Sequence, residues 1–470
     1  MSLTNDEMIL PKAAPMITPT ARSITFPRMT KALKSLSIIS SSIFDVITVT
    51  ESGRLVNCRH DRIIPVISRI TAVYRSFSRQ FWLVSLVMML AWTFHSLIWP
   101  FLTVYASERL NQPLTAVTML LTINSLVGLV STFIGGAIAD RFGRKWVIVF
   151  SFVFSALSWY LFRLAGTLPV FALLMAISGA FTPLYRVASD AMITDVVPVD
   201  ERIEAYSILR MGNNIGVAVG PAIGGFLAAR SYNISFTVTG LGLLLCAVLI
   251  LVFSFETMPR RLQNVDQVQT KPKGSGYGDA FQDRGLLGFL AAMAFNRMGS
   301  ATLWMLLAIH AKSNYGIPED IFGFIPTTNA VMVILFQILI TRKVKRFPAS
   351  GVMTIGALFY AVAVFGVAFG RGFWGFWLCM VIATIGEMVL LPTSTNHVSR
   401  LAPEDKRARY MSLYTITWSI GTALGPLVGG LLNDIISPSA TWIGTGILGL
   451  IGTGMFALFS KRRKNTRYCE

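Results

Sequence analysis

The chain has 470 residues, of which 53% are hydrophobic and only 14% are charged, and its mean hydropathy is +0.61. Soluble domains carry about 25% charged residues, so this composition excludes an ordinary soluble protein. The 41 Lys+Arg exceed the 23 Asp+Glu by a formal charge of +18. Two classes remain, an integral membrane protein and a nucleic-acid binder, and the positions of the cations separate them.

Residues 1–80 contain no convincing apolar span and are basic, which predicts a cytoplasmic N-terminal extension. After them come segments long enough to cross about 30 Å of hydrocarbon, which takes roughly 20 apolar residues in a helix. Lipid offers no partner to unpaired backbone groups, so we expect each segment to be helical. The twelve predicted spans are 81–105, 116–138, 146–165, 168–192, 204–229, 235–255, 286–309, 321–341, 349–370, 373–396, 408–431 and 439–460.

Polar segments separate these spans, and the longest of them is the linker 256–285. A basic tail, 461–470, follows the last span, and we expect it to be cytoplasmic. With the N-terminus inside, 33 of the 41 Lys+Arg lie in cytoplasmic segments, 5 lie on the opposite side and 3 lie within spans. This positive-inside bias predicts a multi-pass protein of the plasma membrane with both termini in the cytoplasm. The lipid bilayer therefore explains the basic excess, and we expect no nucleic-acid partner.

An internal repeat relates the two parts of the chain. When the sequence is shifted by 205 positions, residues 216–225 fall on residues 421–430, and the two segments share one Gly-x-x-x-Gly-Pro-x-x-Gly-Gly frame. The same shift carries the first span onto the seventh. The repeat predicts two parallel six-helix halves, 81–255 and 286–460, joined by the linker.

The repeated frame places glycines four residues apart on one helix face, where another helix can approach closely. Each proline removes one backbone hydrogen bond and favours a kink. Helix packing alone explains this pattern; a functional interpretation adds that a bent, closely packed face lets the halves rock without leaking protons. The residues of this helix-packing motif are Gly216, Gly220, Pro221, Gly224, Gly225, Gly421, Gly425, Pro426, Gly429 and Gly430.

A second motif, Gly-Ala-Ile-Ala-Asp-Arg-Phe-Gly-Arg-Lys over residues 136–145, lies between the second and third spans. Its cations and glycines predict a tight cytoplasmic hairpin, in which Gly136 and Gly143 permit a close backbone approach. The cations by themselves can fix topology. The acid Asp140 contributes nothing to topology, which favours a further role. The corresponding segment 342–348 has lost the acid and the glycine.

Over residues 80–460 the chain resembles the major facilitator transporters, which consist of two parallel six-helix halves. Residues 136–145 match the family's loop signature, and residues 216–225 match the helix-5 motif of its proton-coupled antiporters, including bacterial multidrug-efflux proteins. The resemblance implies an all-α integral membrane fold with twelve transmembrane helices, alternating access to a small-molecule substrate, no cofactor and a monomer. Many drug antiporters of the family carry an Arg early in helix 4, and residues 171–178 contain none.

The resemblance also implies a conformational latch at the loop. Asp140 would contact the neighbouring half, and Arg144 would pair with Asp195 at the end of helix 4, so that the outward-facing state is stabilised. The residues assigned to this latch are Gly136, Asp140, Arg141, Gly143, Arg144, Lys145 and Asp195.

Charged and polar residues inside the spans indicate the functional site. A charge at lipid depth costs at least about 2.5 kcal/mol, so it should face protein or a water-filled cavity. These residues fall mainly on helices 1, 4, 7 and 10, which by the resemblance surround the central cavity. The proton-coupling candidates are Glu387, Asp190 and His95, and the substrate-cavity candidates are Arg186, Arg297, Trp92, Tyr185 and Trp304.

Each charged candidate has a structural alternative. Glu387 lies near the middle of span 10 and either carries the proton or pairs permanently with Arg297. Arg186 and Asp190 are four residues apart on one helix face, so they either neutralise each other or face the substrate. His95 is either a hydrogen-bonded helix contact or a proton relay.

The chemistry of the chain points to a gradient-driven transporter. We find no embedded nucleophile–base constellation, no metal cluster and no ATP-binding motif, and the four cysteines are scattered. We therefore expect no enzyme. The function expected first is proton-coupled efflux of lipophilic drugs. The alternatives are ion-coupled transport of an anionic metabolite, in either direction, and a membrane sensor or scaffold that does not transport.

Overall fold

The computed structural model describes residues 76–258, 282–403 and 407–466, and in these ranges every regular element is a helix, which confirms the predicted all-α fold class. Most of the extension 1–80 and of the linker 256–285 lies outside the described residues. The elements of the first half are α3 (Arg79–Ile98), η1 (Trp99–Phe101), α4 (Leu102–Leu110), α5 (Leu114–Phe142), α6 (Arg144–Phe162), α7 (Leu168–Val196), η2 (Val199–Glu201), α8 (Arg202–Arg230) and α9 (Tyr232–Phe253). Those of the second half are α12 (Arg284–Tyr315), α13 (Glu319–Phe322), α14 (Phe324–Val344), α15 (Ala349–Val367), α16 (Gly372–Leu401), α17 (Arg407–Ile435) and α18 (Pro438–Thr466).

Helices occupy all twelve predicted spans, and several continue beyond them. Helix α5, for example, ends at Phe142, and α6 begins at Arg144, so the predicted hairpin loop is reduced to Gly143. Helix α18 continues to Thr466 and takes up part of the predicted tail. Within the described residues, ten helices are long and apolar enough to cross a membrane by length and composition.

The first predicted span, 81–105, is not one continuous helix. A 3-10 turn over Trp99–Phe101 separates α3 from α4. Pro100 explains the interruption, because proline has no N–H to donate and its ring collides with the carbonyl four residues earlier.

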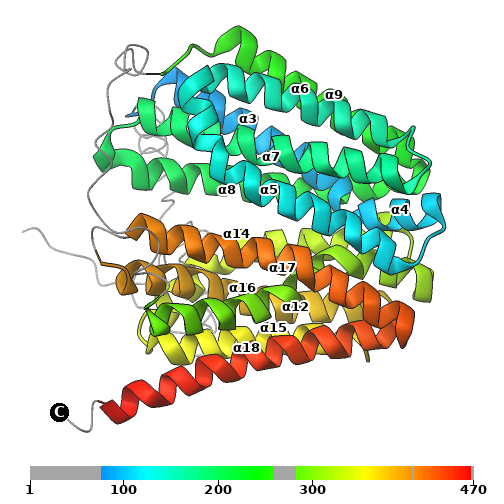
Figure 1. Cartoon of the computed structure of the whole chain (residues 1–470), viewed down its shortest axis with the longest axis vertical. Coiled ribbons are helices and arrows are strands. Elements are labelled where there is room, and N and C mark those ends of the chain that lie inside the picture. Colours follow the sequence, from blue (N-terminus) through cyan, green and yellow to red (C-terminus); the bar gives the residue numbers. More distant parts are fainter. Residues whose placement is uncertain (1–75, 259–281, 404–406, 467–470) are drawn as a thin grey trace, which may run out of the picture. The chain divides into compact units, whose positions relative to one another are not determined.

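The helices α3 to α9 lie together in one group and α12 to α18 in a second group (Figure 1, blue to green and light green to red). In the first group α3 packs on α8, α5 on α7 and α6 on α9. In the second group α12 packs on α17, and α15 packs on α16 and α18. The groups meet where α5 contacts α17 and where α8 contacts α14.

The Gly-Pro segments of α8 and α17 pack closely on the first long helix of their own half. A Cβ atom added at Gly216 would lie 2.7 Å from the carbonyl oxygen of Met89 in α3, and one added at Gly421 would lie 2.9 Å from the carbonyl oxygen of Arg297 in α12. Only glycine allows backbones this close. The predicted close approach is therefore present in both halves.

The last glycine of each segment faces the opposite half instead. A Cβ at Gly225 in α8 would lie 3.2 Å from the Cα of Asp320 in α13, and one at Gly430 in α17 would lie 3.1 Å from the Cα of Thr115 in α5. The repeated frame thus serves two interfaces, one within each half and one between the halves.

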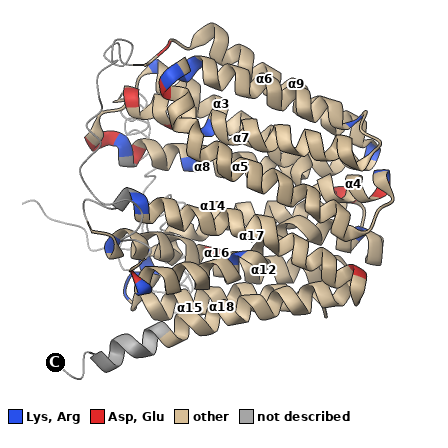
Figure 2. Ribbon diagram, in the orientation of Figure 1, with Lys and Arg blue, Asp and Glu red and all other residues tan. Residues whose placement is uncertain are grey.

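The outward faces of the helices are apolar, and the charges gather at the helix ends. Leu173, Ile338, Leu378 and Phe253 are more than half exposed, as expected of side chains that face lipid. Figure 2 shows Lys, Arg, Asp and Glu mainly at the two ends of the helices, with few along their lengths. The structure separates the end that carries the α5–α6 turn, called here the loop end, from the end that carries α4, called here the α4 end.

Candidate functional site

A cavity of about 420 Å³ lies between the two halves. Its wall includes residues of α3, α5, α7 and α8 from the first half and of α12, α14, α15, α16 and α17 from the second. Seven of the eight proton-coupling and substrate-cavity candidates line it: Trp92, His95, Tyr185, Arg186, Arg297, Trp304 and Glu387. Pro221 of the helix-packing motif also lies on its wall. The sequence missed other wall residues, among them Trp418 and Asn329.

The Glu387 carboxylate is held by neutral hydrogen-bond donors. The Asn329 Nδ2 in α14 donates to Glu387 Oε2 over 2.9 Å and to the hydroxyl of Thr384 over 2.9 Å. The buried Tyr360 hydroxyl also hydrogen-bonds to Glu387. Among the described residues Glu387 forms no ion pair, so the predicted alternative of a permanent pair with Arg297 is not found.

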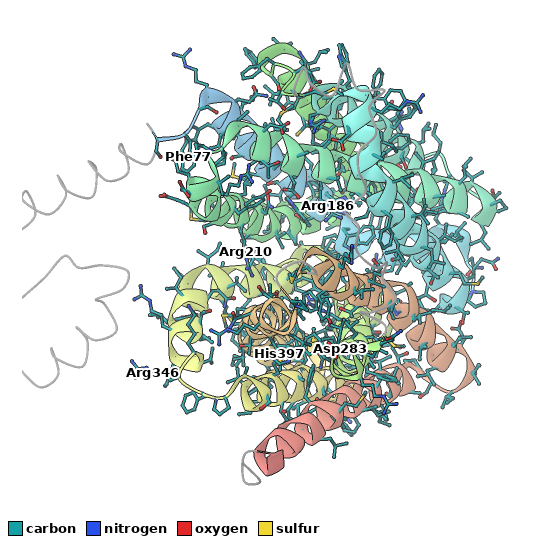
Figure 3. All side chains as sticks on the ribbon, turned by 60° about the vertical axis from the view of Figure 1, so that its left-hand side comes forward. Phe77, Arg186, Arg210, Asp283, Arg346 and His397 are labelled. Carbon is teal, nitrogen blue, oxygen red and sulfur yellow. The ribbon has the colours of Figure 1, made fainter. Side chains whose placement is uncertain are left out.

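Two arginines on the cavity wall lie over tryptophan rings. The Arg186 guanidinium in α7 is 5.5 Å from the ring centre of Trp92 in α3, and that of Arg297 in α12 is 4.8 Å from the ring centre of Trp418 in α17. Both distances are in the range of cation–π contacts. A third arginine, Arg210 in α8, also faces the cavity. Figure 3 shows Arg186 and Arg210 on the side of the first half that faces the second.

Asp190 lies apart from this cavity. It follows Arg186 by one turn of α7, but its side chain is exposed and is not part of the cavity wall. The ion pair with Arg186 that four-residue spacing allowed is absent from the part of the chain that the structure describes. The grouping of Asp190 with the cavity residues is therefore not supported by its position.

His95 is surrounded by aromatic rings. Its imidazole stacks on Trp99 with ring centres 5.1 Å apart and meets Trp159 edge-on at 5.6 Å. No hydrogen bond of the His95 side chain is found among the described residues, so the expected hydrogen-bonded helix contact is not what holds it. The ring packs as part of an aromatic cluster on the cavity wall.

The loop end contains the predicted ion pair. Arg144 Nε lies 3.1 Å from Asp195 Oδ2, and Arg144 also pairs with Asp140 at 2.8 Å. Gly143 has a φ of +90°, a conformation that favours glycine. The sequence missed Glu256, whose carboxylate accepts hydrogen bonds from the N–H groups of Arg144 and Lys145 over 2.9 and 3.1 Å. The sequence does not predict this cap, because Glu256 follows α9 and is far from Arg144 along the chain.

Two expectations for the loop are not met in this conformation. A Cβ at Gly136 would meet nothing within 4 Å, so no close approach requires this glycine here. The Asp140 side chain is 59% exposed and its ion pair is with Arg144, not with the neighbouring half.

Charged contacts that were not predicted from the sequence join the halves at the α4 end. Lys312 in α12 lies 2.6 Å from Glu108 in α4 and 2.5 Å from Glu319 in α13. The Tyr232 hydroxyl in α9 donates to the same Glu319 carboxylate. Glu319 is buried, so this network closes a part of the interface that excludes water.

A second contact at the α4 end caps a helix across the interface. The Asp434 carboxylate in α17 accepts from the N–H groups of Leu114 and Thr115, over 3.2 and 2.7 Å, and from the Thr115 hydroxyl over 2.7 Å. These groups form the N-terminus of α5, where free N–H donors favour an anion.

Comparisons with known proteins agree with this architecture. The family model described as Major Facilitator Superfamily matches residues 81–296 and again residues 289–468. Among curated proteins, the chain is 26% identical to a Na(+), Li(+), K(+)/H(+) antiporter of Planococcus maritimus, over 78% of this chain and 93% of that protein. It is 24% identical to multidrug resistance protein 1 of Bacillus subtilis, over 68% and 81% of the two chains. It is also 24% identical to the quinolone resistance protein NorA of Staphylococcus aureus, over 76% and 90%.

Solved structures share the fold at low identity. The nucleoside transporter NupG aligns with a TM-score of 0.70 at 14% identity, over 81% of this chain and 99% of its own. A bacterial homolog of the human lysosomal transporter Spinster, in an inward-facing conformation, aligns with a TM-score of 0.66 at 16% identity, over 81% and 96%.

Proposed function

The chain belongs to the Major Facilitator Superfamily, and on this premise we propose that it exports lipophilic small molecules in exchange for protons. As a member of that family it is a multi-pass membrane transporter and not an enzyme. The observation that carries the proposal is the cavity between the halves, whose wall holds several aromatic side chains and one carboxylate, Glu387. Apolar walls with a few convergent polar groups are typical of small-molecule sites.

Glu387 is the group through which protons drive export. It faces the cavity and its partners Asn329 and Tyr360 are neutral, so its charge changes with each proton that binds. An uncompensated carboxylate in a membrane-embedded site is a functional feature by default. The substrate binds when the Glu387 carboxylate is ionised, and a bound proton removes that charge. The substrate and the proton therefore compete for Glu387, and this competition is the basis of exchange.

The contacts between the halves support alternating access. Hydrogen bonds and ion pairs close the α4 end, and Gly225 and Gly430 allow the backbones to meet there. The cation bias places both termini and the loop end in the cytoplasm. On this assignment the cavity faces the cytoplasm, and the halves 81–255 and 286–460 are the bodies that rock about it.

The latch acts in the opposite state. When the loop end closes, Asp140 reaches the second half while Arg144 stays fixed by Asp195 and by the backbone of Ala139. We expect Asp140→Asn to slow transport in reconstituted vesicles, because the closed loop end loses one charged contact. An unchanged rate would contradict the latch.

A related antiporter exchanges alkali cations for protons, but the cavity here favours organic substrates. A hard cation takes several oxygen ligands, whereas the described wall offers one carboxylate together with Arg186, Arg210 and Arg297. Three guanidinium groups raise the local potential and oppose a bare cation.

The test is gradient-driven dye transport in proteoliposomes with an acidic lumen. Wild-type protein should concentrate a lipophilic dye in the lumen, and an ionophore that collapses the proton gradient should release it. Glu387→Gln should abolish concentration of the dye, because the site can then no longer exchange a proton for the substrate. The matched control is Glu204→Gln, which removes an exposed acid of α8 outside the cavity wall. Concentration of the dye by Glu387→Gln would overturn the proposal.

A further inference from the structure

The cavity wall carries charges of both signs. Arg186, Arg210 and Arg297 are cations of the wall, and Glu387 is the one carboxylate among the described wall residues. No ion pair joins any of these arginines to Glu387 or to another described residue. Both charges therefore remain open to a ligand.

The two arginines that lie on tryptophans lack an anion. Arg297 is 7% exposed, and its Nε is buried without a hydrogen-bond partner. The Trp418 ring beneath it recovers only part of the hydration that a buried guanidinium loses. Arg186 over Trp92 has the same arrangement in the other half. A planar guanidinium is matched best by a carboxylate, which accepts two parallel hydrogen bonds.

Glu387 lacks a cation in the same way. Its hydrogen-bond partners, the Asn329 amide and the Tyr360 hydroxyl, carry no charge. The aromatic rings of Trp92, Trp304 and Trp418 line the same wall, and two of them lie against Arg186 and Arg297. The wall thus provides a positive pole, a negative pole and aromatic surface.

We propose that the cavity binds an amphoteric aromatic amphiphile. Its carboxylate is neutralised by Arg186 and Arg297, and its basic nitrogen is bound by Glu387. This inference rests on the proposed function and specifies its substrate class. It preserves exchange, because the basic nitrogen and the proton compete for one carboxylate. A ligand with only an acid group would bind better when Glu387 is protonated and would move with the proton. A ligand with only a basic group would leave the arginines uncompensated.

Four fluorescent probes of one shape test the proposal. Nα-dansyl-lysine carries both charges, its methyl ester carries only the amine, Nα-dansyl-norleucine carries only the carboxylate, and the methyl ester of the norleucine derivative carries neither. Binding to purified wild-type protein is measured by dansyl fluorescence, and proton-driven accumulation is measured in proteoliposomes. We expect dansyl-lysine to bind tightest, with a loss of about tenfold or more for each charge removed, as for hydrogen bonds between charged groups.

Substitutions assign the two poles. Arg297→Gln should reduce the ratio of acid affinity to ester affinity, and Glu387→Gln should reduce the ratio of dansyl-lysine affinity to dansyl-norleucine affinity. If Arg297→Gln does not fold, Arg186→Gln replaces it, because Arg186 is only half-buried. This variant should also reduce the ratio of acid affinity to ester affinity. Arg297→Lys keeps the charge but loses the planar donor pair, and it should restore the ratio only in part.

The outcomes separate the two proposals. Tightest binding of dansyl-lysine, with ratios that collapse in the matching variants, supports the amphoteric class. Equal or tighter binding of either singly charged probe overturns the substrate class, even if proton-driven accumulation is intact. Absence of proton-driven accumulation for all four probes and for the lipophilic dye overturns the proposed function itself.

Discussion

The Asn329 side chain in α14 and the Glu387 side chain in α16 are joined by one hydrogen bond of 2.9 Å on the cavity wall. The same amide nitrogen donates its second hydrogen to Thr384, one turn earlier in α16. Asn329 is buried, so its amide has little freedom to turn away. The hydrogen bond to Thr384 holds the amide in place, and the hydrogen bond to Glu387 then orients the carboxylate on which the proposed exchange depends.

We predict that Asn329→Ala lowers the rate of gradient-driven dye transport. The substitution removes the amide that orients the Glu387 carboxylate on the cavity wall. Hydrogen bonds to charged groups contribute about 1.5–3 kcal/mol, so we expect a loss of about tenfold or more. The rate is measured in proteoliposomes that hold equal amounts of each variant.

Thr384→Val is the control for that experiment, because it removes the second partner of Asn329 and leaves the bond to Glu387 in place. It should leave the transport rate within about twofold of wild type, because only a neutral hydrogen bond of about 1 kcal/mol or less is lost. Equal losses in both variants would mean that Asn329 acts on helix packing and not on Glu387.

At the α4 end, Lys312→Met should favour opening. It removes the cation that Glu108 and Glu319 share across the halves, and it leaves Glu319 buried without its charge partner. A partly exposed ion pair contributes up to about 1 kcal/mol, so we expect roughly a fivefold increase in the open population. The measurement is maleimide labelling of Thr103→Cys, because Thr103 in α4 is buried and donates to the carbonyl of Met305 in the other half.

For this labelling, Cys58 and Cys469 are replaced by serine, and Cys246 and Cys379 are buried. Glu108→Gln serves as the comparison. It removes one of the two partners of Lys312 and should raise the labelling rate less than Lys312→Met does. Labelling that is no faster in Lys312→Met than in wild type would show that the network does not hold this end closed.

Asp434→Ala should expose the N-terminus of α5. The carboxylate caps the N–H groups of Leu114 and Thr115 from the other half, and loss of a cap costs about 0.5–2 kcal/mol. We expect faster hydrogen–deuterium exchange of the peptide that contains Leu114 and Thr115, measured by mass spectrometry in nanodiscs. Asn433→Ala, which removes only a donor to Asp434, should change this exchange little. An unchanged exchange rate in Asp434→Ala would contradict the cap.

Two glycine substitutions should have different effects because the glycines serve different interfaces. Gly220→Val places side-chain atoms against Ser96 and Thr93 of the same half, so it should lower the thermal stability of the protein. Gly430→Val places them against Thr115 and Thr118 of the other half, so it should disfavour closure of the α4 end. Overpacking of this kind costs about 1–3 kcal/mol.

Thermal unfolding and the Thr103→Cys labelling rate distinguish the two effects. Gly220→Val should lower the unfolding temperature most, whereas Gly430→Val should mainly raise the labelling rate. Gly351→Ala is the control, because its Cβ meets nothing within 4 Å and Gly351 belongs to neither motif. If Gly430→Val leaves labelling unchanged, this glycine is not required for closure.

The sequence predicted the helices and many of the cavity residues for one physical reason. In lipid, backbone groups must be paired within helices and charges must turn inward. Apolar length therefore located the spans, and the polar residues inside them, such as Glu387 and Arg297, marked the cavity. The first span was predicted as one helix, but α3 is followed by a 3-10 turn over Trp99–Phe101. Pro100 causes this interruption, and the proline is itself visible in the sequence.

The partners of these residues were beyond the reach of the sequence. Four-residue spacing allowed an ion pair between Arg186 and Asp190, but the structure turns Arg186 toward Trp92 and the cavity and leaves Asp190 outside it. Periodicity gives the face of a helix and not the neighbour that this face meets. For the same reason the role of Asn329 could not be predicted. Asn329 is polar but uncharged, and only the packing of α14 on α16 brings it to Glu387.

The sequence by itself determined that the protein lies in a lipid bilayer, how many spans it has and which repeat relates its halves. These properties follow from composition and local periodicity. Only the tertiary structure decided which charges pair and which stay open. Lys312 meets Glu108 and Asp434 meets α5 across the halves, whereas Arg297 and Glu387 share a cavity without pairing. Contacts between distant segments depend on helix rotation and crossing, and these are set by the packing of the whole bundle.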